Sequence, residues 1–178
     1  MLYFEYLIIY KVDGGVDVLR IDRFDEENWN DIHSIYEEGL QTRNASFQLK
    51  APIWEEWDKS HLTFCRFMIV HDLEVLGWAA LSPVSNREVY KGVAEVSIYV
   101  ALKHGGKGLG KKLLEHLVKE SEKKGIWTLQ ANIFPENKAS LHIHRFNGFR
   151  VVGRREKIAQ LDGKWRDTIL LERRSSRI

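Results

Sequence analysis

Four glycines in six positions make residues 105–110 the stretch of this sequence best suited to chemistry. Residues 97–102 before it are rich in β-branched and aromatic types, which predicts a strand, and the leucine spacing from Leu109 to Leu117 predicts a helix after it. The first N–H groups of a helix lack partners within the helix, and the helix dipole is positive there, so such a turn favours an anion. The sequence therefore predicts a phosphate cradle. Its residues are Gly105, Gly106, Lys107, Gly108, Leu109, Gly110 and Lys111.

Three kinds of phosphate-binding loop share parts of this pattern. A P-loop needs Gly-x-x-x-x-Gly-Lys followed by Ser or Thr, whose hydroxyl binds Mg²⁺, but Lys112 stands at that position. A dinucleotide-binding fingerprint, Gly-x-Gly-x-x-Gly, can begin at Gly106 or Gly108, but its third glycine is then missing. The segment also resembles the pyrophosphate loop of the GNAT N-acetyltransferases, Arg/Gln-x-x-Gly-x-Gly/Ala, through Gly108 and Gly110. The loop alone favours the GNAT interpretation, although Gly105 replaces the usual Arg or Gln.

Composition predicts one globular domain and argues against several classes of partner. The chain has 178 residues, of which 44% are apolar, enough to build a sizeable core. Its formal net charge of +2 does not favour nucleic acid or a membrane surface. The apolar start, residues 1–10, is shorter than the roughly 20 residues of a membrane span and lacks the features of a signal peptide. Cys65 stands alone, which suits a reducing compartment, so we expect a cytoplasmic protein.

The rest of the chain predicts alternating helices and strands. Helices are expected at 25–40, at 52–57, from 109 to a stop at 125, and at 137–146. Strands are expected at 17–21, 63–70, 75–81, 97–102, 127–134, 149–161 and 164–172. Asp162-Gly163 between the last two strands is a strong hairpin signal. We expect residues 1–16 to be an added strand or an upstream extension, 17–174 to be one domain, and 175–178 to be a solvated basic tail.

The resemblance to GNAT enzymes extends beyond the glycine loop. Residues from about 20 to 173 resemble the phosphinothricin acetyltransferase branch of that superfamily. The motifs that carry the resemblance are Ala45-Ser-Phe47, Ala94-Glu-Val-Ser-Ile-Tyr-Val100, Gly106-Lys-Gly-Leu-Gly110, Asn137-Lys-Ala-Ser140, His144, Gly148-Phe149 and Asp162-Gly-Lys-Trp-Arg-Asp167. The resemblance implies an α/β (α+β) GNAT fold, in which a mixed, mostly antiparallel central sheet carries helices on both faces.

The same resemblance implies an acetyl-CoA-dependent N-acetyltransferase. Its acceptor would be the α-amine of a small amino-acid-like substrate of the phosphinothricin or methionine sulfoximine type, attacked directly without a covalent enzyme intermediate. Backbone groups of Ile98, Tyr99 and Val100 would pair with the pantetheine arm as an added strand does. Asn137 and Ser140 would also contact the cofactor, and Asn137 is in addition a plausible helix N-cap. A homodimer is implied, with the terminal hairpin near the subunit contact.

Glu95 is the candidate general base. An isolated glutamate has a pKa near 4.3, which is too low for an efficient base at neutral pH. The apolar neighbours Ala94 and Val96 provide a setting that would raise this pKa, or a water could relay the proton. The structural alternative is a glutamate on the wet face of a sheet.

His144 is the candidate general acid, since the resemblance places it where many GNAT enzymes carry a tyrosine. An imidazolium with a pKa near neutrality could protonate the departing thiolate or stabilise it. The alternative is an ordinary buried or surface histidine. His142 lies two positions away and diverges from His144 on a helix, so the two do not form a metal pair. We expect no metal.

Phe47 and Arg87 are the candidate acceptor-binding residues, because the resemblance places both near the acceptor pocket. An arginine could hold a substrate carboxylate through two parallel hydrogen bonds, whereas a loose surface pair with Glu88 is the plainer interpretation. The sequence leaves other functions open. These are acetylation of a protein N-terminus or a polyamine, a CoA sensor without turnover, and a nucleotide-binding module.

Overall fold

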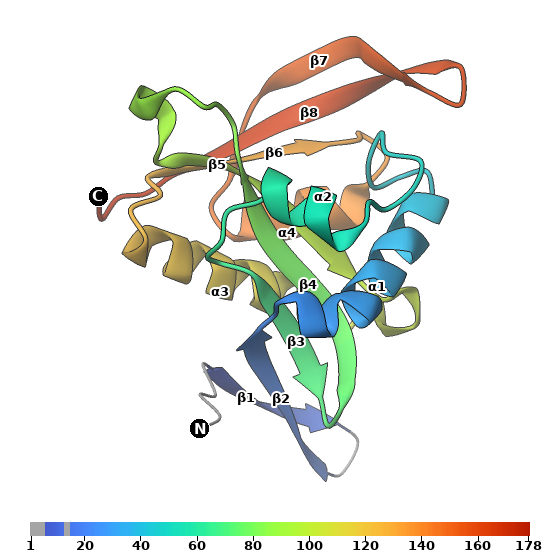
Figure 1. Cartoon of the computed structure of the whole chain (residues 1–178), viewed down its shortest axis with the longest axis vertical. Helices are drawn as coiled ribbons and strands as arrows, with labels where there is room; N and C mark the ends of the chain where they lie inside the picture. The colour runs from blue at the N-terminus through green and yellow to red at the C-terminus, as the bar shows by residue number, and fades with distance from the viewer. Residues whose placement is uncertain (1–5, 13–14) are drawn as a thin grey trace.

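The computed structural model describes residues 6–12 and 15–178. The strands are β1 (Tyr6–Val12), β2 (Gly15–Arg23), β3 (Phe67–His71), β4 (Glu74–Pro83), β5 (Val93–Val100), β6 (Thr128–Ile133), β7 (Arg150–Leu161) and β8 (Lys164–Arg174). The helices are α1 (Trp29–Gln41), α2 (Trp54–Ser60), α3 (Leu109–Lys123) and α4 (Lys138–Phe146), with 3₁₀ turns η1 (Glu26–Asn28), η2 (Glu88–Tyr90) and η3 (Leu102–His104). Within this part of the chain the strands form one eight-stranded sheet in the order β1-β2-β3-β4-β5-β6-β8-β7 (Figure 1).

Neighbouring strands of the sheet are antiparallel except at its centre, where β5 and β6 run parallel. This confirms the predicted mixed, mostly antiparallel sheet. The pairing of β4 with β5 extends as far as Gly77 opposite Val100. The pairing of β5 with β6 ends after Glu95 opposite Gln130. Beyond that point the two central strands have only their outer neighbours, β4 and β8, as partners.

Helices cover both faces of the sheet, as predicted (Figure 1). One buried cluster joins α1 and α2 to Trp78 and Ala80 of β4, and the other joins α3 and α4 to Ala79 and Leu81 of the same strand. Because side chains alternate along a strand, this pattern fixes which face each residue of β4 and β5 occupies. Tyr99 lies in the α1–α2 cluster, so Glu95 faces the same side.

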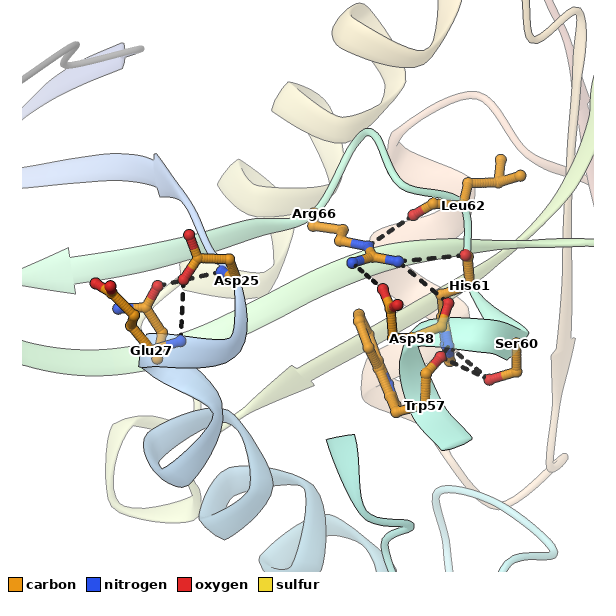
Figure 2. Close-up of polar contacts among 9 residues, drawn as sticks. Asp25, Glu27, Trp57, Asp58, Ser60, His61, Leu62 and Arg66 are labelled. Atoms are coloured by element: carbon orange, nitrogen blue, oxygen red, sulfur yellow. Dashed lines mark hydrogen bonds and ion pairs between the residues drawn. The ribbon is translucent and has the colours of Figure 1, made fainter. Parts of the chain in front are cut away.

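The N-terminus of the first helical segment is built as the sequence predicts. The Asp25 carboxylate accepts a hydrogen bond of 3.0 Å from the Glu27 N–H, and the Asn28 side chain accepts one of 3.2 Å from the Asp25 N–H (Figure 2). This reciprocal capping satisfies N–H groups that the helix cannot pair by itself.

The structure differs from the predicted elements in two places. The strand expected at 63–70 begins only at Phe67, because Cys65 has a φ of 57° and the chain before it turns. Of the C-terminal tail, Ser175 is buried against the domain and its N–H donates to the Trp127 carbonyl at 2.8 Å, whereas residues 176–178 are exposed.

The N-terminal segment contributes an edge strand, since β1 pairs with β2 along its described length. Residues 1–5 and 13–14 of the segment expected as an added strand or an extension lie outside the described residues. Among the helices of the described chain, none has the length and apolar character needed to cross a membrane.

Candidate functional site

A cavity of about 1080 Å³ opens where β5 and β6 part. Its walls come from residues 95–100 of β5, residues 131–134 at the end of β6, the loop 42–48 after α1, the start of α3, and α4. The separated strands leave backbone N–H and C=O groups without a neighbouring strand on the cavity side. Buried backbone groups require partners, so this edge suits an extended ligand that can pair with it.

The predicted phosphate cradle forms one end of this cavity. Gly108 is the N-cap of α3, and both Gly106 and Gly108 have a φ of 77°, a conformation that other residues rarely adopt. A Cβ added at either position would meet no atom within 4 Å, so both face open space. The first N–H groups of α3 therefore point toward a region that an anion can enter, which fits a pyrophosphate.

Gly105 and Gly110 do not have the positive φ of Gly106 and Gly108. Gly105 has a φ of −58°, which any residue can adopt, so its backbone does not require glycine. A Cβ at Gly110 would lie 3.3 Å from the Ile143 side chain and 3.5 Å from the Val100 side chain. Gly110 thus allows β5, α3 and α4 to approach closely beside the cradle.

Cationic side chains surround the cradle. Lys103 forms an ion pair with Glu74, and the His104 imidazole lies 3.2 Å from the same carboxylate. His104 and Lys111 line the cavity, and the Lys111 ammonium sits 3.3 Å from the centre of the Phe146 ring. Lys107 lies 3.4 Å from His104 but is not part of the cavity wall. His104 was not among the residues expected from the sequence.

Glu95 is half-buried in the cavity wall at the point where the central strands separate. It lies opposite Ser82 of β4, which also lines the cavity, so the two side chains share a face of the sheet. The candidate base is therefore next to the end of the unpaired strand edge.

His144 is almost fully buried in the cavity wall. Its Nδ1 lies 2.8 Å from the Ser140 carbonyl oxygen, which can only accept, so Nδ1 carries the proton. Burial lowers the pKa of His144 to about 4, so the ring is neutral at pH 7 and Nε2 is a hydrogen-bond acceptor. The imidazolium expected from the sequence is not the resting form, because desolvation outweighs the carbonyl that stabilises the charge.

Three buried polar atoms in the cavity wall have no partner among the described residues. They are Oδ1 of Asn44, Nε2 of His144 and the Thr168 hydroxyl of β8. Buried polar atoms are nearly always hydrogen-bonded, and an orphaned one at a cavity surface indicates a place that a ligand or water fills. This fits a cavity built to hold a polar molecule.

Asn137 and Ser140 organise α4 at the cavity. The Asn137 side chain accepts a 3.0 Å hydrogen bond from the Ser140 N–H, so the predicted N-cap is present. Its amide nitrogen donates to the Asn44 carbonyl at 3.0 Å, which ties α4 to the loop after α1. Both ends of this amide are therefore engaged within the protein, although both residues line the cavity.

The three residues expected to accompany the pantetheine arm lie along the unpaired stretch of β5. Ile98, Tyr99 and Val100 all line the cavity. The Tyr99 ring stacks on Trp78 at 4.9 Å and contacts Tyr36, on the α1–α2 side of the sheet. Burial raises the pKa of the Tyr99 hydroxyl well above its ordinary value, so this hydroxyl stays protonated.

The two candidate acceptor residues have different positions. Phe47 lines the cavity and meets Phe134 edge to face at 4.8 Å. Arg87 is exposed at η2, its guanidinium lies 5.5 Å from the centre of the Tyr90 ring, and it is not part of the cavity wall of this chain. The expectation that Arg87 holds a substrate carboxylate has no support in this geometry, because the loop before β5 directs it to the surface.

Sequence reasoning missed several residues of the acceptor half of the cavity. Ser60 and His61 at the end of α2, Ser82 of β4 and Thr168 of β8 all line it. None belongs to a spaced motif, and each reaches the cavity through tertiary packing. No cluster of three or more metal-binding side chains occurs among the described residues.

Comparison with known proteins agrees with this geometry. The family model described as Acetyltransferase (GNAT) family matches residues 27–149. The chain belongs to the GNAT family. It is 34% identical over 99 residues to the L-methionine sulfoximine/L-methionine sulfone acetyltransferase of Pseudomonas paraeruginosa, a match covering 56% of this chain and 58% of that protein. The chain thus spans well under two thirds of that relative.

Two further relatives cover more of the chain. The phosphinothricin N-acetyltransferase of Streptomyces viridochromogenes is 28% identical over 132 residues, which cover 72% of each protein. The crystal structure of a GNAT superfamily phosphinothricin acetyltransferase from Sinorhizobium meliloti, in complex with acetyl-CoA, has a TM-score of 0.78 at 27% identity and covers 88% of each chain. The fold and the cradle of this GNAT protein therefore fit acetyl-CoA.

Gly110→Val tests the cradle end of the cavity. The valine side chain would press on Val100 and Ile143, both in the cavity wall, so we expect acetyl-CoA affinity to fall at least about tenfold through lost fit. Isothermal titration calorimetry measures the affinity of each protein for acetyl-CoA. Gly153→Ala in β7, where a Cβ meets nothing within 4 Å, is the control and should bind normally. Unchanged affinity in a folded Gly110→Val variant would place the cofactor elsewhere.

Stability should fall on acidification because of two imidazoles, the buried ring of His144 and the half-buried ring of His61. Burial lowers the pKa of His61 and of His144 to about 4, whereas an unfolded histidine titrates near 6.5. The unfolded chain therefore binds more protons between these values, so stability falls as pH drops from about 6.5 to about 4. Each group contributes up to about 3 kcal/mol of this loss.

Denaturant unfolding measured across this pH window tests the effect. In His144→Asn the slope of unfolding free energy against pH should fall by about half, since one of the two groups no longer titrates. The readout is the slope, so a variant that is less stable overall still reports it. His142→Asn, an exposed position on the same helix, should keep the original slope. Equal slopes in all three proteins would show that His144 is not held neutral.

Proposed function

We propose that this protein is an acetyl-CoA-dependent N-acetyltransferase that acts on the α-amine of a small amino-acid-like substrate. The observation that carries the proposal is the parting of β5 and β6 directly after Glu95, with a glycine-rich helix N-terminus at the other end of the same cavity. The single, buried Cys65 suits a reducing compartment, and we place the protein in the cytoplasm.

Different parts of the cavity wall would bind different parts of acetyl-CoA. The backbone around Gly106 and Gly108 and the first turn of α3 receive the pyrophosphate. The open edge of β5 from Val96 to Val100 offers N–H and C=O groups to the amides of the pantetheine arm, as in strand addition. When bound, acetyl-CoA would supply an acetyl thioester that the amine attacks directly, so that a C–N bond forms as the C–S bond breaks. The nitrogen then gives up its second proton to solvent, and the departing thiolate takes up a proton from solvent to leave as the thiol of CoA.

Glu95 would act as the general base that deprotonates the substrate amine. The acceptor arrives as an ammonium and must lose a proton before its lone pair can attack, and the Glu95 carboxylate at the start of the open edge can take that proton directly or through a water. His144, neutral with Nδ1 protonated, offers only an acceptor at Nε2. It enters the proposal as a hydrogen-bond acceptor in the cavity wall and not as a proton donor.

An amino-acid-like acceptor is favoured by the relatives, whose names include phosphinothricin, L-methionine sulfoximine and L-methionine sulfone. The aromatic pair Phe47 and Phe134 gives the cavity an apolar wall against which a short side chain can lie. Protein N-termini and polyamines are the competing acceptors. A panel of free amino acids, their amides, polyamines and peptides, assayed for thiol release from acetyl-CoA, separates these classes.

Glu95→Gln tests the chemistry. The amide keeps the shape of the side chain but cannot take the proton, so we expect kcat to fall roughly 10²- to 10⁴-fold while acetyl-CoA affinity is unchanged. The acidic limb of the pH–rate profile should disappear. Glu88→Gln, at an exposed carboxylate paired with Lys91 outside the cavity, is the control and should keep full activity. Near-normal turnover of Glu95→Gln at pH 7 would refute the assignment of the base.

We also propose a homodimer in which the β7–β8 hairpin forms the contact. Leu161 and Leu171 of this hairpin are buried within the chain, but Val151, Ile158 and Trp165 are exposed. Exposed apolar side chains gathered on one element favour association.

Sedimentation velocity at micromolar concentration should therefore show a dimer. Trp165→Asp should shift it toward monomer, because a charge would have to be buried in the contact. Leu73→Asp, which changes a 93% exposed leucine in the turn between β3 and β4, should leave the dimer intact. A wild-type monomer with full activity would exclude a dimer requirement.

A further inference from the structure

The turn that follows α2 is held far more firmly than a surface turn requires. The buried Arg66 guanidinium donates to the backbone carbonyls of Leu62 at 2.7 Å and of Asp58 and His61 at 3.3 Å (Figure 2). It also pairs with the Asp58 carboxylate at 2.6 Å and lies 5.0 Å from the centre of the Trp57 ring. One side chain thereby fixes the backbone on both sides of His61.

The His61 ring is fixed independently of this backbone. It stacks on Trp57, with ring centres 4.0 Å apart and planes 14° apart. Its Nδ1 lies 2.8 Å from the Trp57 carbonyl, which only accepts, so Nδ1 carries the proton. Burial lowers the pKa of His61 to about 4, and the ring is neutral at pH 7. Its Nε2 is then an acceptor, and it has no partner among the described residues.

His61 lines the same cavity as Glu95. Its neighbour Ser60 lines this cavity as well. The Leu62 N–H donates to the Leu81 carbonyl at 2.8 Å, which places this turn beside β4, and the next residue, Ser82, lies opposite Glu95. The α2 helix packs on the face of the sheet that Glu95 occupies.

The spacing suits the two ends of one small molecule. With β4 between them, the backbones at His61 and Glu95 are about two strand spacings, or roughly 10 Å, apart. An amino acid whose amine lies at Glu95 can therefore extend its side chain toward His61. An unused acceptor that the protein has oriented in advance discriminates well, because a substrate without a matching donor leaves it unpaired.

We propose that His61 is a specificity-determining residue whose Nε2 accepts a hydrogen bond from the far end of the amine substrate. His61 thereby selects substrates with an N–H or O–H donor at that end. This inference rests on the proposed N-acetyltransferase function. A substrate that ends only in acceptor oxygens would set lone pairs against the Nε2 lone pair. The position of His61 Nε2 is fixed by three contacts: Arg66 holds the His61 backbone, the ring stacks on Trp57, and Nδ1 donates to the Trp57 carbonyl.

L-Methionine sulfoximine and L-methionine sulfone provide a matched pair of probes. They have nearly the same shape, but the sulfoximine has an N–H where the sulfone has a second acceptor oxygen. His61→Phe keeps an aromatic ring against Trp57 and removes Nε2. We expect this variant to raise KM for the sulfoximine roughly three- to tenfold, the range for one neutral hydrogen bond, with kcat and the KM for the sulfone little changed.

Two further variants separate this role from a structural one. His61→Gln presents an amide oxygen and should recover part of the preference for the sulfoximine. His33→Phe changes another histidine that packs against a tryptophan, Trp29, outside the cavity, and should alter neither KM. Calorimetric binding of both probes to the CoA-loaded protein gives a readout independent of turnover, and the sulfoximine should again lose affinity selectively in His61→Phe.

Equal changes for both probes in His61→Phe, or no change for either, would overturn the inference. If His61→Phe does not fold, a preference for the sulfoximine that is reduced but not lost in His61→Gln supports the inference, and an unchanged preference in His61→Gln or the absence of a wild-type preference refutes it. Failure of the proposed function has a different result, because wild-type protein would then release no thiol with any amine acceptor.

Discussion

The site depends on one constraint in the sheet: β5 and β6 pair only as far as Glu95 and Gln130. Each strand continues against its outer neighbour, β5 along β4 to Val100 and β6 along β8 to Ile133. The sheet is therefore intact on both sides of a gap, and the gap exposes backbone groups that need partners. A ligand that can pair like a strand completes the sheet, which explains why the cavity, the cradle and Glu95 all lie along this gap.

The loop that closes the acceptor side is tied to three separate elements. Tyr36 of α1 hydrogen-bonds Gln48, and Asn137 at the start of α4 donates to the Asn44 carbonyl. Arg166 of β8 donates to the Arg43 carbonyl at 3.1 Å. The β8 strand and the start of α4 thus hold the same loop, so changes in either element can act on this wall of the cavity from outside it.

The sequence predicted the parts of this site that local patterns determine. The glycine turn, the strand before it and the helix after it follow from residue types and spacing, and the Asn137 cap follows from its position before an apolar periodic segment. The mixed, mostly antiparallel sheet came from the resemblance, whereas the strand order came only from the structure. Single positions depend on long-range packing and were less predictable. Arg87 faces solvent because of the η2 turn, and His61 reaches the cavity through tertiary contacts such as the Leu62–Leu81 hydrogen bond and those of Arg66.

The protonation states of the histidines also depend on long-range packing that the sequence does not reveal. The sequence places His144 on a helix but cannot show that the surrounding protein buries it and that the Ser140 carbonyl fixes its tautomer. Burial lowers the pKa of His144 to about 4, so the ring is neutral at pH 7, and the Ser140 carbonyl holds the proton on Nδ1 and leaves Nε2 as an acceptor. The same physical causes act on His61, which belongs to no motif at all.

The most direct test of the open strand edge is amide hydrogen exchange with and without saturating acetyl-CoA. If the cofactor pairs with β5, exchange should slow at residues 96–100 and in the first turn of α3, while the β1–β2 pair at the far edge of the sheet is unaffected. Unchanged exchange at residues 96–100 in protein saturated with acetyl-CoA would contradict the account.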